Sequence, residues 1–140
     1  MYAWPTPRPA LETAVAIVSA AFGDYAPVSV SMPRQVPPRF IKMARIGGSR
    51  PNPVTDLAAI SLDVFALDHA TVEYMCSTLD EAMHNAIGTI VNNTFIRDWG
   101  NIVGPIGGRP HPDLLSMIRM TVVGDLMLST STPAVVPPGS

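Results

Sequence analysis

Three side chains that can bind a metal ion occur at four-residue intervals between positions 76 and 84. Cys76, Asp80 and His84 would lie one turn apart on one face of a helix, and thiolate, carboxylate and imidazole groups all bind zinc. Cys76 also falls on the apolar stripe of that helix, where a buried free thiol behaves as a small hydrophobic side chain. We therefore predict no metal site here.

Two other segments resemble catalytic or cofactor-binding motifs. Asp68, His69 and Glu73 could form an acid–base cluster, but a catalytic histidine needs a nucleophile and an orienting partner. Asp68 is better interpreted as a helix N-cap. The Gly104–Gly108 segment is not a phosphate-binding loop, because no Gly-Lys-Ser/Thr follows it. Neither segment is therefore a strong candidate for catalysis or phosphate binding.

Charge is divided unevenly along the chain. No acidic residue lies between Asp24 and Asp56, whereas no Lys or Arg lies between Arg50 and Arg97. The first segment carries Arg34, Arg39, Lys42, Arg45 and Arg50, and the second carries Asp56, Asp63, Asp68, Glu73, Asp80 and Glu81. The two segments could neutralise each other within one subunit if neighbouring strands pair. Alternatively, the positive edge of one subunit meets the negative edge of the next, and such a contact can close a ring.

The second interpretation gives a set of candidate interface residues. They are the residues available to a subunit or partner, with one aromatic side chain as a contact anchor: Arg34, Arg39, Arg45, Arg50, Asp56, Asp80, Glu81 and Trp99.

The composition favours a subunit whose surface is partly covered by neighbouring subunits. Charged residues are 14% of the 140 residues, against about 25% in a typical soluble domain. The net charge of −2 argues against a basic nucleic-acid binder, and a single cysteine excludes a disulfide framework. The apolar stretch Ala14–Phe22 is far shorter than the ~20 residues of a membrane span. We expect a reducing cytoplasm as the default location.

Periodicity predicts an α+β fold. Apolar residues at helical spacing indicate helices over 9–22 and 69–87, and alternation indicates strands over 28–32, 40–46, 58–66 and 115–128. We expect an antiparallel or mixed sheet of about four to five strands, with both helices on one face. Residues 89–113 are predicted to be a long irregular loop, with a short strand at 94–99 as the alternative. The predicted boundaries are a flexible arm over 1–8, a single domain over 9–128 and a disordered tail over 129–140.

One run of residues resembles a known family. Pro37-Pro-Arg-Phe-Ile-Lys-Met-Ala-Arg-Ile-Gly-Gly48 is followed by Asn52-Pro-Val-Thr-Asp56, a strand, a helix, Gly104-Pro105, Pro112-Asp113 and a closing strand. This order resembles the tail terminator proteins of long-tailed, siphovirus-type bacteriophages, particularly those of actinobacterial hosts. The similarity covers roughly residues 8–128. The last strand departs from the family pattern, because Met120 follows Arg119 where an aromatic residue is usual.

The resemblance implies a structural role in the virion. Such a subunit forms a hexameric ring that caps the head-proximal end of the tail tube, ends its polymerisation and joins the tail to the head-completion (stopper) proteins. The implied partners are further copies of the chain, the tail tube protein and the stopper protein, with no nucleic-acid sequence recognition and no membrane. The implied location is the virion tail, after assembly in the host cytoplasm, and no catalysis or cofactor is implied.

Two alternatives remain at this point. The chain could be another head–tail connector, neck or tube subunit of a phage. It could also be a small ligand-binding or enzymatic α+β domain. That alternative requires a deep pocket with convergent polar groups near residues 89–113.

Overall fold

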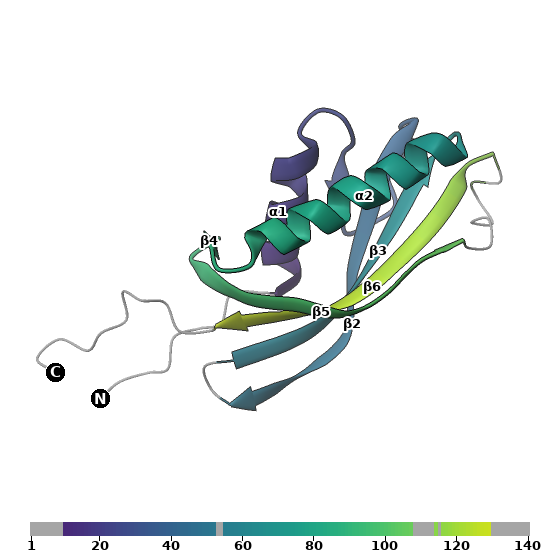
Figure 1. Ribbon diagram of the computed structural model, residues 1–140. Coiled ribbons are helices and arrows are strands. Elements are labelled where there is room, and N and C mark those ends of the chain that lie inside the picture. Colours follow the sequence, from purple (N-terminus) through teal and green to yellow (C-terminus); the bar gives the residue numbers. More distant parts are fainter. Residues whose placement is uncertain (1–9, 53–54, 108–113, 115, 130–140) are drawn as a thin grey trace, which may run out of the picture.

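A single mixed sheet with both helices on one face forms the protein (Figure 1). The computed structural model describes residues 10–52, 55–107, 114 and 116–129. Its elements are α1 (Ala10–Phe22), β1 (Val28–Ser29), β2 (Arg39–Asn52), β3 (Thr55–Ala66), α2 (His69–Ala86), β4 (Ile90–Val91), β5 (Thr94–Gly107) and β6 (Ile118–Ser129). The predicted α+β class, with both helices on one face, is confirmed.

The strand order is β1-β2-β3-β6-β5-β4. The pairs β2–β3, β3–β6, β5–β6 and β4–β5 are antiparallel, and β1 pairs with β2 in parallel. The sheet has six strands rather than the expected four to five, because two of them are only two residues long. The four long strands form its centre.

Helix α2 has the buried face that its periodicity predicts. Asp68 caps its N-terminus, where one carboxylate oxygen accepts a hydrogen bond from the Thr71 backbone N–H at 2.8 Å. The stripe of fully buried side chains consists of Val72, Met75, Leu79 and Met83. These residues join the main core together with the inward side chains of β3, among them Ile60, Leu62 and Val64. The helix is therefore held against the sheet by one apolar stripe.

Strand β2 continues beyond residue 46, where the predicted strand ends, and includes Gly47 and Gly48. Gly48 has a φ of +129°, and a Cβ there would lie 2.1 Å from the carbonyl oxygen of Leu57 on β3. The register shifts between Arg45 and Gly47. The glycines therefore form an irregularity at which the two strands approach closely, instead of a turn, and pairing resumes beyond it.

The prediction of an irregular loop over 89–113 is wrong for residues 90–91 and 94–107, whereas the alternative of a strand at 94–99 is confirmed, with the strand extending to Gly107. This segment is β5, which pairs with β6 along its length. Its register shifts at three places, which interrupts the alternation by which a strand is recognised in a sequence. Residues 108–113 lie outside the described residues, as do the predicted arm at 1–8 and residues 130–140. Ser129 still belongs to β6, so the predicted tail boundary falls one residue early.

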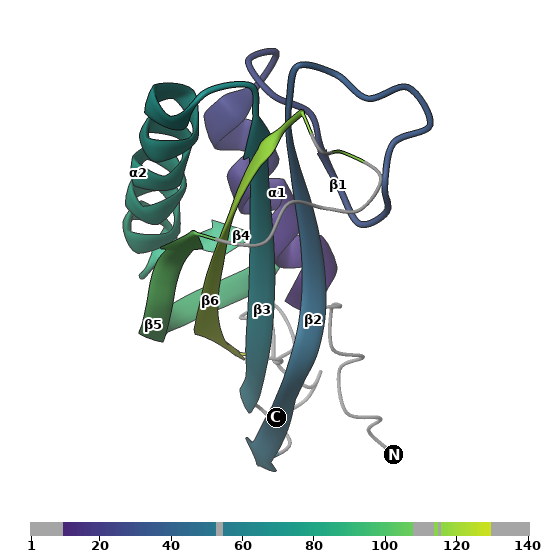
Figure 2. The ribbon, with the colours of Figure 1, turned by 90° about the vertical axis from the view of Figure 1, so that its right-hand side faces the viewer.

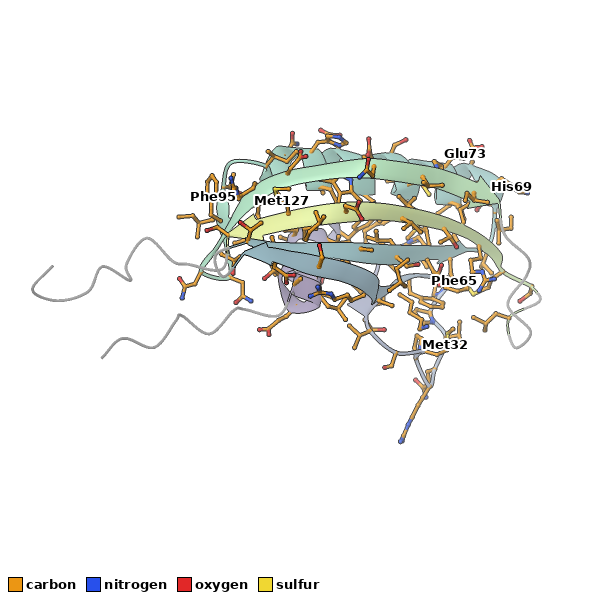
Figure 3. All side chains as sticks on the ribbon, turned by 90° about the horizontal axis from the view of Figure 1, so that it is seen from below. Met32, Phe65, His69, Glu73, Phe95 and Met127 are labelled. Carbon is orange, nitrogen blue, oxygen red and sulfur yellow. The ribbon has the colours of Figure 1, made fainter. Side chains whose placement is uncertain are left out.

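A second, smaller apolar cluster lies on the sheet face that points away from the helices. The rings of Phe40 and Phe65 stack at a centroid distance of 4.5 Å, with Met117 beside them. Met32 packs against this cluster from the segment between β1 and β2. Figure 3 shows this sheet face, with Phe65 and Met32 at one end and Phe95 and Met127 at the other. Within the described chain, no helix covers this face.

Candidate subunit interface

The Arg45–Asp56 pair is formed within one chain. Two guanidinium nitrogens of Arg45 lie 2.9 and 3.0 Å from the two carboxylate oxygens of Asp56, which is 4% exposed. The Arg45 Nε also donates to the carbonyl oxygen of Gly47 at 3.0 Å. Gly48 leaves room for this arrangement, because a Cβ there would be 3.0 Å from the guanidinium. For these two candidates the intramolecular alternative is the correct one.

Other charged residues of the two segments are also engaged within the chain. The Arg39 guanidinium lies 4.1 Å from the centre of the Tyr25 ring, and its Nε donates to the Tyr25 carbonyl oxygen at 2.9 Å. Lys42 lies opposite Asp63 in the β2–β3 register. Asp68 is the N-cap, and hydrogen bonds from the backbone and hydroxyl of Thr71 lower its pKa. Through its two contacts with Tyr25, Arg39 stabilises the turn after α1.

Trp99 is not an exposed anchor. It lies within β5, its side chain is 3% exposed, and it belongs to the main core. Its ring lies over Gly124 of β6, where a Cβ would be 2.5 Å from two ring carbons. The prediction that this aromatic could meet a partner is wrong, because the strand that contains it directs it into the core.

Three exposed charged residues of the two segments, Arg34, Glu73 and Glu81, remain available for contacts outside the described part of the chain. All three are exposed, and none has a hydrogen bond or ion pair with another described residue. Asp80 is also exposed, and its carboxylate lies 3.3 Å from the Nδ1 of His84 on the next turn of α2. Arg50 lies in β2, but its side chain is outside the described part of the structure.

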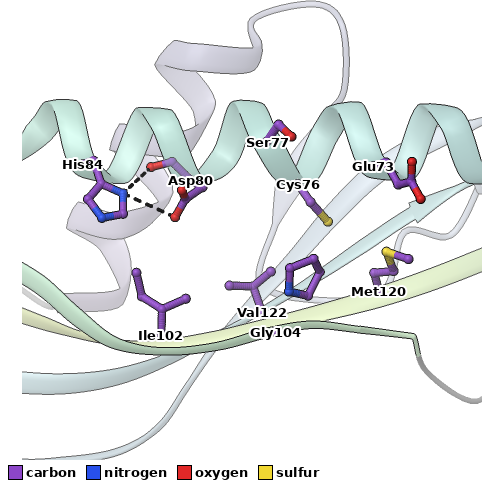
Figure 4. Close-up of a pocket in the computed structure, with 10 residues that line it drawn as sticks. Glu73, Cys76, Ser77, Asp80, His84, Ile102, Gly104, Met120 and Val122 are labelled. Atoms are coloured by element: carbon purple, nitrogen blue, oxygen red, sulfur yellow. Dashed lines mark hydrogen bonds and ion pairs between the residues drawn. The ribbon is translucent and has the colours of Figure 1, made fainter.

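A groove lies between α2 and the strands β5 and β6 (Figure 4). It encloses about 650 Å³. Ile102, Pro105, Met120 and Val122 make an apolar floor, while Glu73, Ser77, Asp80 and His84 line it from the helix. Met120 and Val122 are alternate residues of the strand predicted over 115–128, so the sequence places them on one face of that strand. The sequence has no signal for Ile102 and Pro105, because residues 89–113 are predicted to be a loop.

The described side chains of the groove provide little basis for catalysis or metal binding. Burial, and secondarily the nearby charge of Glu73, raises the pKa of the Cys76 thiol to about 11, so the thiol is protonated and weakly nucleophilic at neutral pH. Among the described residues, no group of three or more His, Cys, Asp or Glu side chains is arranged to hold a metal ion. Ile102, Gly104 and Pro105 line the groove, and they belong to the segment near which the ligand-binding alternative requires a pocket. However, Glu73, Ser77, Asp80 and His84 are exposed to solvent rather than buried around a ligand site.

Comparison with known proteins finds a likeness in structure but none in sequence. No protein-family model and no curated protein sequence matches the chain. A solved chain from "Virion of native gene transfer agent (GTA) particle" is similar in structure, with a TM-score of 0.58 and 10% sequence identity. The match covers 81% of this chain and 85% of that chain. At this identity the likeness shows a shared fold. In the described part of this chain, no helix is long and apolar enough to span a membrane.

Proposed function

We propose that the protein is a structural virion subunit, a tail terminator that forms a ring, ends tail-tube polymerisation and joins the tail to the head-completion proteins. The observation that carries the proposal is the fold shared with a chain of a gene transfer agent virion over most of both chains. The resemblance of residues 37–56 to tail terminators supports the more specific role.

The edges of the sheet support assembly from copies of this chain. β1 pairs only with Ile41 and Lys42 of β2, and β4 pairs only with Thr94 and Phe95 of β5. Most of β2 and β5 therefore has one side that no described strand pairs. Such edges are available to a neighbouring chain. Because the two edges differ, a contact between them would be head-to-tail and could close a ring.

The proposal includes a hexamer, with the tail tube and stopper proteins as partners and the head-proximal end of the tail as location. It gives the protein no enzymatic activity and no cofactor. The high pKa of Cys76 and the solvent-exposed polar side chains of the groove agree with a role in assembly rather than catalysis.

Electron microscopy of the purified protein, with and without tail tubes, tests this function. A terminator should form closed rings that bind one end of each tube and stop its growth. Long polymers of the protein alone would instead identify a tube subunit. Rings that bind no tube end would point to a connector or neck protein. The shared virion fold supports a connector or neck role as well as it supports a terminator role.

A further inference from the structure

We propose that residues 30–38 of one copy, which we name the Arg34 loop, insert into the groove between α2 and β5–β6 of the next copy. This inference rests on the proposed ring. It names the contact by which successive subunits would meet.

The groove has the composition of a docking site for a basic, apolar segment. Its floor is apolar, and Glu73 and Asp80 place two carboxylates along its helical wall (Figure 4). Glu73 has no partner among the described residues, so its charge is available. An apolar floor supplies affinity through burial, whereas a carboxylate on the wall selects the charge of the segment that enters.

The Arg34 loop has the complementary composition. Arg34 is exposed and without a partner among the described residues, and Val36 is 43% exposed. No acidic residue lies anywhere between Asp24 and Asp56. Pro33, Pro37 and Pro38 restrict the backbone, which reduces the conformational entropy lost when the loop binds.

The loop and the groove lie on opposite sides of one subunit. Figure 2 shows α2 at one side of the sheet and the segment between β1 and β2 projecting at the other. The loop of a subunit therefore cannot fill the groove of the same subunit. Repeating one loop-into-groove contact links copies head-to-tail, and such a contact closes into a ring when its rotation allows.

Disulfide capture between two different variants tests the contact directly. In a Cys76→Ser background, one preparation carries Gln35→Cys in the loop and the other carries Ser77→Cys in the groove wall. Both positions are exposed. Mild oxidation of the mixture should give a cross-linked dimer that contains one copy of each variant. The matched control pairs Gln35→Cys with Glu81→Cys, which is exposed on the same helix but does not line the groove.

Charge exchange provides a second measurement. Arg34→Glu and Glu73→Arg should each raise the concentration needed for assembly about tenfold, and the double variant should recover most of the loss. Circular dichroism should show all three variants folded, because both positions are exposed. Sedimentation velocity measures the assembly.

The outcomes of these experiments test the loop-into-groove contact and the proposed ring separately. If rings form but the mixed pair cross-links no better than the control, the loop-into-groove contact is wrong and the proposed ring stands. If the double variant assembles no better than the single variants, Arg34 and Glu73 do not meet. If the protein stays monomeric with and without tail tubes, both the ring and this contact are overturned.

Discussion

The charged residues differ in whether they already have an interaction partner within the subunit. Arg45 is bound to Asp56, and Arg39 is stacked on Tyr25, so both charges already have a partner within the subunit. Arg34 and Glu73 have no such contacts with described residues. The sequence presents all four as equivalent members of two charge runs. Their contacts within the subunit show which charged side chains stabilise the fold and which are available for assembly.

Removing Arg45 should destabilise the subunit. Arg45→Ala leaves the buried Asp56 carboxylate without its guanidinium partner, so we expect a loss of about 1–3 kcal/mol in the free energy of unfolding. The cost should be smaller in an Asp56→Ala background. Arg34→Ala is the matched control, since it removes the same charge from an exposed site. Equal urea midpoints for Arg45→Ala and Arg34→Ala would show that the pair adds no stability.

The Cys76 thiol should react slowly in the folded protein. Its pKa is raised from 9.0 to about 11, which lowers the thiolate concentration about a hundredfold at neutral pH. Alkylation by iodoacetamide should therefore be at least that much slower in the native state than in urea. The native rate should increase as the pH rises toward 11. Glu73→Gln should accelerate it, since the Glu73 charge contributes to the raised pKa. A native rate equal to the unfolded rate would contradict the burial of this thiol.

At the scale of elements, helix α2 serves both the core and the groove. Its apolar stripe is fully buried against the sheet, while its exposed side chains line the groove that faces β5. Strand β5 contributes Trp99 to the core near one end and Ile102 and Pro105 to the groove farther along. The groove therefore exists because two elements that pack on the core also extend beyond it.

Truncating the buried stripe of α2 should weaken folding. Leu79 is fully buried, and Leu79→Ala should lower the free energy of unfolding by about 2–5 kcal/mol through lost burial and the cavity left behind. Glu81→Ala, on the exposed side of the same helix, should change it by less than about 0.5 kcal/mol. Chemical denaturation measures both values. An unchanged midpoint for Leu79→Ala would show that α2 does not pack as described.

At the scale of the whole molecule, complementary surfaces lie on opposite sides of the subunit. The segment that contains the Arg34 loop projects on one side, and α2 lies on the other (Figure 2). Glu73 and Asp80 of α2 line the groove. The sheet also ends in two different edge strands that are mostly unpaired by described residues. A subunit with this polarity is suited to head-to-tail assembly.

Assembly should weaken as salt is added. Exposed charge pairs are screened over about 10 Å at 0.1 M ionic strength and over shorter distances at higher salt. We expect the concentration for half-maximal ring formation to rise several-fold between low and high salt, with the thermal unfolding of the subunit nearly unchanged. Arg50→Glu should have the same sign of effect, because it reverses a charge of the positive segment. Sedimentation across a salt series measures this. Assembly that is insensitive both to salt and to Arg50→Glu would contradict a charge-guided interface.

The sequence by itself determined the elements whose patterns are local. The stripe of α2, its Asp68 cap and the alternation of β3 and β6 follow from spacing within short windows, and all three are present in the structure. The α+β class followed from their order. Local patterns suffice here because each element buries one regular face.

Only the tertiary structure decided what depends on distant residues. β5 has register shifts that break its alternation, so its pairing with β6, rather than its own sequence, identifies it as a strand. Trp99 is buried because Gly124, on another strand, leaves space for its ring. Arg45 pairs with Asp56 because the β2–β3 hairpin places them together. The groove forms only because α2 lies beside β5. Each of these features arises from contacts between different strands and helices, and composition and periodicity do not specify which residues of those elements meet.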